Sequence, residues 1–142
     1  MDKHLIISNS PKDTKRIGGE IAAKLKSGGV IALSGDLGAG KTVFAKGVAR
    51  ALEVTDEVIS PTFTLVRSYT GKAGITLHHF DAYRLTDEAE AEAAGLAELI
   101  GEAGSISVIE WPERIEGLLP RGTVWARISK IGDDKREIEV GE

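Results

Sequence analysis

The eight residues from Gly35 to Thr42, Gly-Asp-Leu-Gly-Ala-Gly-Lys-Thr, match the Walker A pattern at every fixed position. In such a loop, glycines let backbone N–H groups turn inward and bind phosphate oxygens beside a helix N-terminus. Lys41 would reach the β- and γ-phosphates, and the Thr42 hydroxyl would bind Mg²⁺. The side chain of Asp36 is expected to point away from the phosphates. The residues predicted to contact nucleotide here are Asp36, Leu37, Gly38, Ala39, Gly40, Lys41 and Thr42.

The alternative is an ordinary glycine-rich turn between a strand and a helix. The context favours the phosphate loop, because that loop requires a buried strand before it and a helix after it. Val30 to Leu33 is a continuous apolar run, as in a strand buried on both faces. A helix is predicted from about Lys41 to Leu52, with Phe44 and Val48 on its apolar face.

Two acids follow apolar runs and are candidates for holding Mg²⁺ or its water shell. Asp81 follows Ile75–Phe80, and Glu110 follows Ile106–Ile109. A P-loop enzyme places such an acid at the end of a strand near the phosphates. Periodicity does not choose between the two, and either one alone would also fit a solvated acid at a strand end.

Thr62, in Ser60-Pro61-Thr62-Phe63, is a candidate switch residue whose hydroxyl would contact Mg²⁺ or the γ-phosphate. On local sequence alone, a plain turn is the favoured interpretation. His78 and His79 would point to opposite faces of a strand, so they cannot easily share a metal and are interpreted as structural.

The two tryptophans of the chain have different expected locations. Trp111 follows Glu110 and is either a core residue or a neighbour of the nucleotide. Trp125 lies in a predicted late strand and is expected in the core.

Composition limits the classes of protein to consider. The chain has 142 residues, a net charge of −4 and no cysteine, which excludes disulfide scaffolds and thiolate chemistry. The negative charge argues against binding nucleic acid through phosphate neutralisation alone. No apolar run approaches the roughly 20 residues of a membrane span or the 7–15 of a signal peptide core. We therefore expect one cytoplasmic domain over residues 1–142.

The elements around these residues predict an α/β domain. Residues 5–7 suggest a first strand, and Ser10, Pro11 and Asp13 suggest a capped helix start with a capping-box acid. Residues 65–69 and 75–80 predict an antiparallel hairpin, Thr86 begins another helix, and residues 124–128 and 138–140 close the sheet. The expected fold is a three-layer, P-loop NTPase-like domain with a mixed, mostly parallel central sheet.

Four ordered motifs resemble the TsaE family, small bacterial P-loop ATPases of tRNA threonylcarbamoyladenosine synthesis. Besides the Walker A loop, Ser60–Phe63 is similar to the family's S-P-T-[FY] segment. His79–Leu85 matches H-x-D-x-Y-R-L, and Ile109–Pro112 matches an acid–tryptophan segment. The likeness runs from about Ser10 to Pro120.

The resemblance implies ATP and ADP as nucleotides and Mg²⁺ as the metal. It implies Lys41, Asp81 and Glu110 as catalytic residues, with Asp81 the Walker B-type acid and Thr42 and Glu110 serving the metal. It places Thr62 in the switch, Trp111 near the nucleotide, Ser10–Thr14 beside the adenine and Arg136 opposite. Val43 departs from the family, which usually has a second threonine there.

The same resemblance implies two protein partners, TsaB and TsaD. TsaD transfers threonylcarbamoyl to adenosine 37 of tRNAs that read codons beginning with A. A TsaE protein binds the TsaB–TsaD dimer and resets it by hydrolysing ATP, so tRNA is met only indirectly and no membrane is involved. Residues 85–113 hold eight acids and no Lys or Arg, which fits either a basic protein partner or a solvated face.

Other functions stay open at this point. We expect a slow ATPase completed by a partner, with Arg67 and Arg84 as candidate charge-stabilising residues that the sequence does not place. A small-molecule kinase would need an acceptor pocket and a lid, and no long insertion supplies one. A nucleotide-gated binding module would need no hydrolysis. A GTPase is disfavoured because Asn9, the only asparagine, is not part of an N-K-x-D motif.

Overall fold

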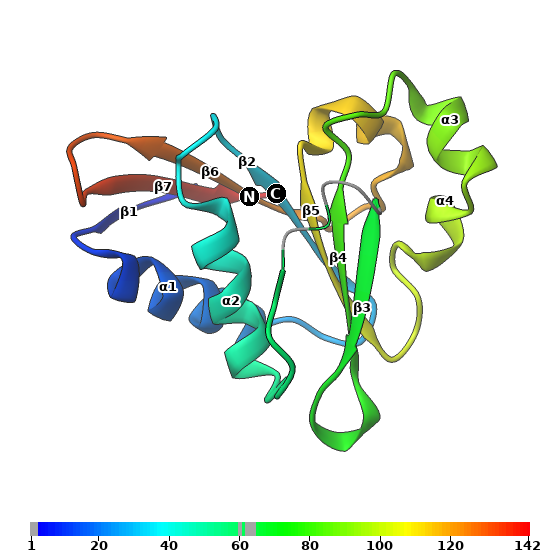
Figure 1. Ribbon diagram of the computed structural model, residues 1–142, viewed down its shortest axis with the longest axis horizontal. Coiled ribbons are helices and arrows are strands. Elements are labelled where there is room, and N and C mark those ends of the chain that lie inside the picture. The colour runs from blue at the N-terminus through cyan, green and yellow to red at the C-terminus, as the bar shows by residue number, and fades with distance from the viewer. Residues whose placement is uncertain (1–2, 60, 62–64) are drawn as a thin grey trace.

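A central β-sheet organises the molecule, as the computed structural model shows (Figure 1). The structure describes residues 3–59, 61 and 65–142. Within them the sheet has seven strands in the order β1-β7-β6-β2-β5-β4-β3. The strands are β1 His4–Ser8, β2 Gly29–Ser34, β3 Val66–Thr70, β4 Thr76–Asp81, β5 Ser105–Glu110, β6 Val124–Lys130 and β7 Arg136–Gly141.

The centre of the sheet is parallel and its edges are antiparallel. Strand β2 pairs in parallel with β5 and β6, and β5 pairs in parallel with β4. At one edge β3 pairs antiparallel with β4, which confirms the predicted hairpin. At the other edge β6, β7 and β1 pair antiparallel in turn. The carboxyl ends of β2, β4, β5 and β6 therefore meet at one end of the sheet.

Helices cover both faces and confirm the expected three layers (Figure 1). Helices α1 (Pro11–Ala23) and α2 (Lys41–Ala51) bury one face around Ile31, Leu33 and Phe44. Helices α3 (Glu88–Ala93) and α4 (Leu96–Leu99), with the 3₁₀ segment η2 (Pro112–Leu118), bury the other. A short 3₁₀ turn, η1 (Lys72–Gly74), closes the β3–β4 hairpin.

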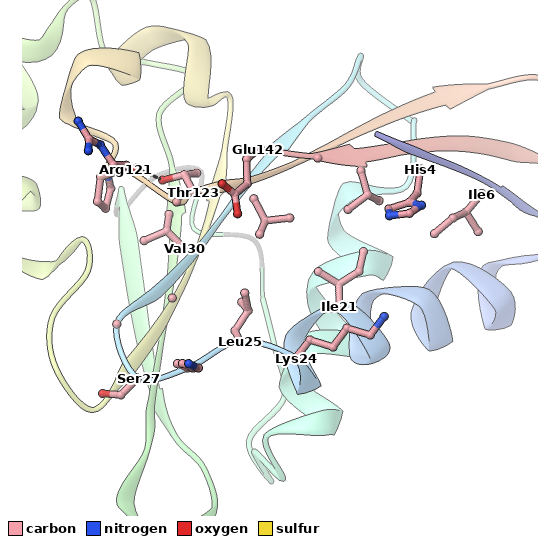
Figure 2. A pocket seen from close by; sticks show the side chains of 18 residues that line it. His4, Ile6, Ile21, Lys24, Leu25, Ser27, Val30, Arg121, Thr123 and Glu142 are labelled. Atoms are coloured by element: carbon pink, nitrogen blue, oxygen red, sulfur yellow. Dashed lines mark hydrogen bonds between the residues drawn. The ribbon is translucent and has the colours of Figure 1, made fainter. Parts of the chain in front are cut away.

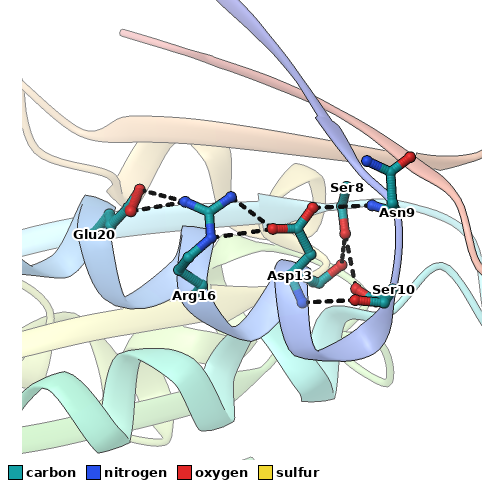
Figure 3. Close-up of polar contacts among 7 residues, drawn as sticks. Ser8, Asn9, Ser10, Asp13, Arg16 and Glu20 are labelled. Carbon is teal, nitrogen blue, oxygen red and sulfur yellow. Dashed lines mark hydrogen bonds and ion pairs between the residues drawn. The ribbon is translucent and has the colours of Figure 1, made fainter.

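Helix α1 begins where the sequence predicts, with a modified cap (Figure 3). Ser10 is the N-cap, and its Oγ accepts the N–H of Asp13 at 3.1 Å. In a standard capping box Asp13 would bond the N–H of Ser10, but its Oδ2 accepts the N–H of Asn9 at 3.0 Å. Arg16 then donates to Asp13 at 2.6 Å and to Glu20 at 2.7 Å. The first turn of α1 is thus closed by a continuous polar chain.

Two glycines allow α1 and α2 to pack backbone against backbone. A Cβ on Gly47 would lie 1.9 Å from the carbonyl oxygen of Lys15, and one on Gly18 would lie 2.5 Å from that of Phe44. Real Cβ atoms do not approach oxygens so closely, so any side chain at these positions would push the helices apart. The close contact fixes the helix that follows the phosphate loop.

Trp125 was expected in the core, and this prediction is wrong. Its side chain is only partly buried and lies outside both apolar clusters. The guanidinium carbon of Arg127 lies 4.5 Å from the ring, so the indole is a surface platform for a cation.

Over the described ranges, no helix is both long enough and apolar enough to cross a bilayer.

Candidate nucleotide site

The predicted phosphate loop joins β2, which ends at Ser34, to α2, which begins at Lys41. Gly40 is the N-cap of α2 and has a left-handed backbone with φ +105°, a conformation that residues with a Cβ rarely adopt. Gly38 is also left-handed, with φ +80°. No side chain caps the N-terminus of α2, so its first N–H groups keep the arrangement that suits an anion.

Lys41 is buried, with 6% of its surface exposed, and it points back over the loop. Its Nζ donates to the carbonyl oxygen of Gly35 at 2.7 Å and lies 3.7 Å from the ring centroid of Trp111. Burial lowers the pKa of Lys41, while nearby carboxylates, Glu110 first and Asp81 next, act to raise it. The lysine is therefore held between the loop and a group of acids.

The two candidate acids lie side by side at the end of the sheet that carries the loop. Asp81 ends β4 and Glu110 ends β5, and the two are direct neighbours in the strand register. Both are buried, with 5% and 4% exposure. Asp81 Oδ1 accepts the N–H of Tyr83 at 2.9 Å, and Glu110 Oε2 is bonded to His79 Nε2 at 2.6 Å. The structure thus places side by side two acids that the sequence offers as separate candidates.

The carboxylate oxygens of Asp81 and Glu110 suit Mg²⁺ better than they suit a metal ion that is bound by protein side chains alone. Among the described residues, no group of three or more His, Cys, Asp or Glu would hold a metal. Mg²⁺ is usually bound by one or two carboxylates together with substrate phosphates and water. Asp81, Glu110 and the Thr42 hydroxyl are oxygen donors of this kind.

Trp111 adopts a left-handed backbone, with φ 58° and ψ 48°, immediately after Glu110. Such strain in a residue with a bulky side chain persists only where the surroundings enforce it, and it gathers at functional sites. Its ring packs on Tyr83 at 4.8 Å between centroids and faces the Lys41 ammonium. The ring of Trp111 thus lies beside Lys41 and packs on the second core cluster, while its place near the nucleotide stays a prediction.

Arg136, the first residue of β7, binds the loop through its carbonyl oxygens, a role that the sequence did not suggest. Its Nε donates to the carbonyl oxygen of Ala39 at 2.8 Å and its Nη2 to that of Gly38 at 3.4 Å. Its Nη1 donates to Gly132 and Lys135 oxygens in the β6–β7 turn, at 3.2 and 3.0 Å. The guanidinium therefore ties the turn to the loop through carbonyls, leaving the loop N–H groups uninvolved.

The remaining predicted residues fall into three groups. Ser10 lies at the same end of the sheet, but its side chain already caps α1, and with Val43 it lines a groove between α1 and α2. Arg67 and Arg84 are exposed. Thr62 lies outside the described residues.

The two neighbouring histidines point to opposite faces of β4, as predicted, and have different partners. His78 bonds Ser68 at 2.7 Å and Glu102 at 3.0 Å, outside the candidate site. His79 bonds Glu110 inside it. The prediction that both are structural overlooks the bond between His79 and Glu110. Alternation along β4 separates the faces of the two histidines, but only the register of β4 against β5 brings His79 to the acid.

A second hollow lies at the opposite end of the sheet (Figure 2). This cavity of about 690 Å³ is bordered by the end of α1, the start of β2 and the residues before β6. Its lining includes Ile21, Leu25, Val30, Arg121 and Thr123, and none of the predicted site residues. This cavity is therefore separate from the candidate chemistry, whereas the larger groove between α1 and α2, of about 930 Å³, is lined in part by Ser10.

Comparison with known proteins gives a consistent result. The family model described as "Threonylcarbamoyl adenosine biosynthesis protein TsaE" matches residues 8–138. A Treponema pallidum protein named tRNA threonylcarbamoyladenosine biosynthesis protein TsaE is 41% identical over 134 residues, covering 94% of this chain and 97% of the relative. Its Bacillus subtilis namesake is 43% identical over 129 residues, covering 91% and 79%. The crystal structure of B. subtilis YdiB aligns with a TM-score of 0.81 at 36% identity, covering 98% of this chain and 84% of that one.

Proposed function

This chain belongs to the TsaE family of threonylcarbamoyladenosine biosynthesis proteins, and on that premise we propose that it binds ATP with Mg²⁺ and hydrolyses it. The observation that carries the proposal is the position of Lys41. It lies between the phosphate loop and the adjacent carboxylates of Asp81 and Glu110. A phosphate-binding loop, a cation and a pair of metal-binding acids are the parts that phosphoryl transfer requires.

Each residue has a stated role in this proposal. Lys41 exchanges its bond to Gly35 for the β- and γ-phosphates, and the loop N–H groups bind the remaining phosphate oxygens. Thr42, Asp81 and Glu110 would hold Mg²⁺ or its water shell, and the bound metal would neutralise charge on the phosphates. Glu110 would alternatively orient the attacking water. The water oxygen bonds to the γ-phosphorus and gives one proton to a phosphate oxygen, the bond from that phosphorus to the bridging oxygen breaks, and ADP and phosphate leave.

The base would lie beside the start of α1, where Ser10–Thr14 border the adenine and Arg136 stands on the opposite side. The groove lined by Ser10 and Val43 opens next to the loop and supports this position. Since adenine presents no group that demands the N-K-x-D motif, the lack of that motif is consistent with ATP.

The proposed partner is a TsaB–TsaD complex, and the chain meets tRNA only through it. The acidic segment at residues 85–113 lends this little support, because most of its carboxylates have partners inside the chain. Those that accept hydrogen bonds internally are Asp87, Glu88, Glu90, Glu102, Glu110 and Glu113. The proposed partnership therefore rests on family membership, and activity alone is expected to be slow.

The test measures phosphate release from Mg²⁺–ATP with and without TsaB–TsaD, alongside formation of modified tRNA. Glu110→Gln should lower hydrolysis on the order of 100-fold while ATP still binds. Glu116→Gln, an exposed glutamate of η2, is the matched control and should behave as wild type.

Two results would overturn the proposal. Label transferred from the γ-phosphate of ATP to an acceptor other than water would indicate a kinase. Repeated rounds of tRNA modification with a slowly hydrolysed ATP analogue would indicate a nucleotide-gated binding module.

A further inference from the structure

His79 is fully buried, with 0% of its surface exposed, and among the described residues the one hydrogen bond of its side chain goes to a candidate catalytic carboxylate. The bond joins His79 Nε2 to Glu110 Oε2 at 2.6 Å. An ionised carboxylate only accepts hydrogen bonds, so Nε2 must be the donor. One oxygen of Glu110 is thereby held, and Oε1 has no hydrogen-bond partner within the described residues.

The other ring nitrogen of His79 adds a free-energy cost that an apolar side chain in the same place would not have. Over the described part of the chain, His79 Nδ1 is buried without a hydrogen-bond partner. Buried polar atoms are nearly always paired, and an unpaired one calls for an explanation. An apolar residue, like the buried Leu77 on the same face of β4, would avoid this cost. The imidazole therefore does something that packing alone does not require.

The neighbourhood of Glu110 shows what that is. Among the carboxylates that act on Lys41, Glu110 has the strongest influence, so the two charges attract each other. Yet Lys41 donates to Gly35, and across the described residues no ion pair joins it to Glu110. The Glu110 side chain is instead hydrogen-bonded to His79.

We propose that His79 is a positioning residue: its Nε2–H holds the Glu110 carboxylate away from Lys41, so that the lysine stays available for phosphates and the carboxylate for metal or water. The inference rests on the proposed ATPase function and adds a residue to it. Groups that orient a metal-binding or catalytic side chain in this way typically change affinity or activity 10- to 100-fold when removed.

The experiment compares His79→Leu, which removes the donor, with His79→Gln, which carries an amide N–H in its place. His78→Leu is the matched control, because His78 is the adjacent buried residue of β4 and bonds only groups outside the site. The readouts are kcat, the Mg²⁺ concentration for half-maximal rate, and ATP affinity from Trp111 fluorescence in a Trp125→Phe background. All variants are assayed where urea titration shows them folded.

His79→Leu should lower kcat on the order of 10-fold, raise the Mg²⁺ requirement, and weaken ATP binding by a smaller factor of about 3-fold, because Lys41 is then drawn toward Glu110. His79→Gln should restore most of kcat, and His78→Leu should match wild type. In a double-mutant cycle with Glu110→Gln, adding His79→Leu should cost little more, because both changes remove the same element.

Failure of the inference is distinguishable from failure of the proposed function. The inference is overturned if wild type and Glu110→Gln behave as proposed but His79→Leu equals His78→Leu, or if the effects of His79→Leu and Glu110→Gln multiply. The proposed function fails, and the inference with it, if wild type releases no phosphate with TsaB–TsaD and Mg²⁺ present.

Discussion

The two ends of the parallel strands differ in what they offer a ligand. At the carboxyl end, the strands stop in Ser34, Asp81 and Glu110, and the phosphate loop lies over them. At the amino end lies the cavity of about 690 Å³, whose walls mix aliphatic side chains such as Ile21 and Leu25 with charged ones such as Lys24 and Arg121 (Figure 2). This cavity is lined by none of the predicted site residues, and the polar groups converge at the other end. In an open α/β sheet, ligands bind beyond the carboxyl ends of the strands, so strand direction indicates where the chemistry lies.

Helix α1 connects the two ends and differs along its length in the same way. Its first turn, at the carboxyl end of the strands, is closed by Ser10 and Asp13 (Figure 3). Its last turn has no basic residue, and the residues just beyond it, Lys24 and Leu25, border the cavity. We therefore expect changes at the loop end to alter nucleotide chemistry and changes at the cavity end to alter stability alone.

The largest effect is expected for Lys41→Ala at the loop end. Removing the cation should lower ATP hydrolysis with TsaB–TsaD at least 100-fold, roughly 2.7 kcal/mol of transition-state stabilisation. Stability should not fall, because burial already disfavours the charged lysine, as its lowered pKa shows. Phosphate release and urea unfolding measure the two quantities. A rate of hydrolysis within threefold of wild type would contradict the expected difference between the two ends of the sheet.

The converse change is Gly28→Ala at the cavity end. Gly28 has φ +84°, and its Cβ would lie 3.0 Å from the carbonyl oxygen of Gly101. The variant should lose about 2 kcal/mol of unfolding free energy, with kcat per folded molecule unchanged. Gly122→Ala is the control, since φ is +87° there but nothing lies within 4 Å of the added Cβ. It should lose less, which separates backbone strain from the clash, and a fall in kcat for Gly28→Ala would show the ends to be coupled.

Arg136→Ala tests a residue that supports the loop without belonging to it. Loss of the bonds to Gly38 and Ala39 should loosen the loop and weaken ATP binding about fivefold, roughly 1 kcal/mol. Arg136→Lys should recover only part, because a lysine cannot contact the loop and the β6–β7 turn in the same planar geometry. Calorimetry with Mg²⁺–ATP measures the affinity. Arg127→Ala, one strand away beside Trp125, is the control. An equal loss of ATP affinity in that variant would contradict the role given to the Arg136 bonds.

Local patterns predicted the fold and the loop well, and long-range pairing explains what they missed. The strands, the capped start of α1 and the Walker A segment depend on residues close together in sequence. The His79–Glu110 bond spans 31 residues, and the Arg136 bond to Ala39 spans 97. Both depend on strand register, which no local pattern carries. The prediction for Trp125 is wrong for another reason: an apolar residue in a strand can face either side, and this ring lies at the surface against Arg127.

The smallest effect is expected for Asp13→Asn, which tests whether the capped turn matters to stability apart from the nucleotide. The N–H of Asn9, and then Arg16, hold the pKa of Asp13 below its usual 3.8. A carboxyl whose folded-state pKa is depressed stabilises the fold above its unfolded pKa, and that contribution is lost as pH falls through the folded value. Asp13→Asn should therefore lower the urea midpoint slightly at pH 7, and the difference from wild type should shrink as the pH falls below 3.8.

Glu20→Gln provides the control for that experiment, since Glu20 also bonds Arg16 but lies farther from the cap. It should shift the midpoint less, because it leaves the bond from Asn9 to Asp13 intact. A difference between Asp13→Asn and wild type that persisted in acid could not come from the carboxylate charge. It would instead mean that the amide disturbs the shape of the first turn. That outcome would mean that stability depends on packing at the loop end of α1, as is expected at the cavity end.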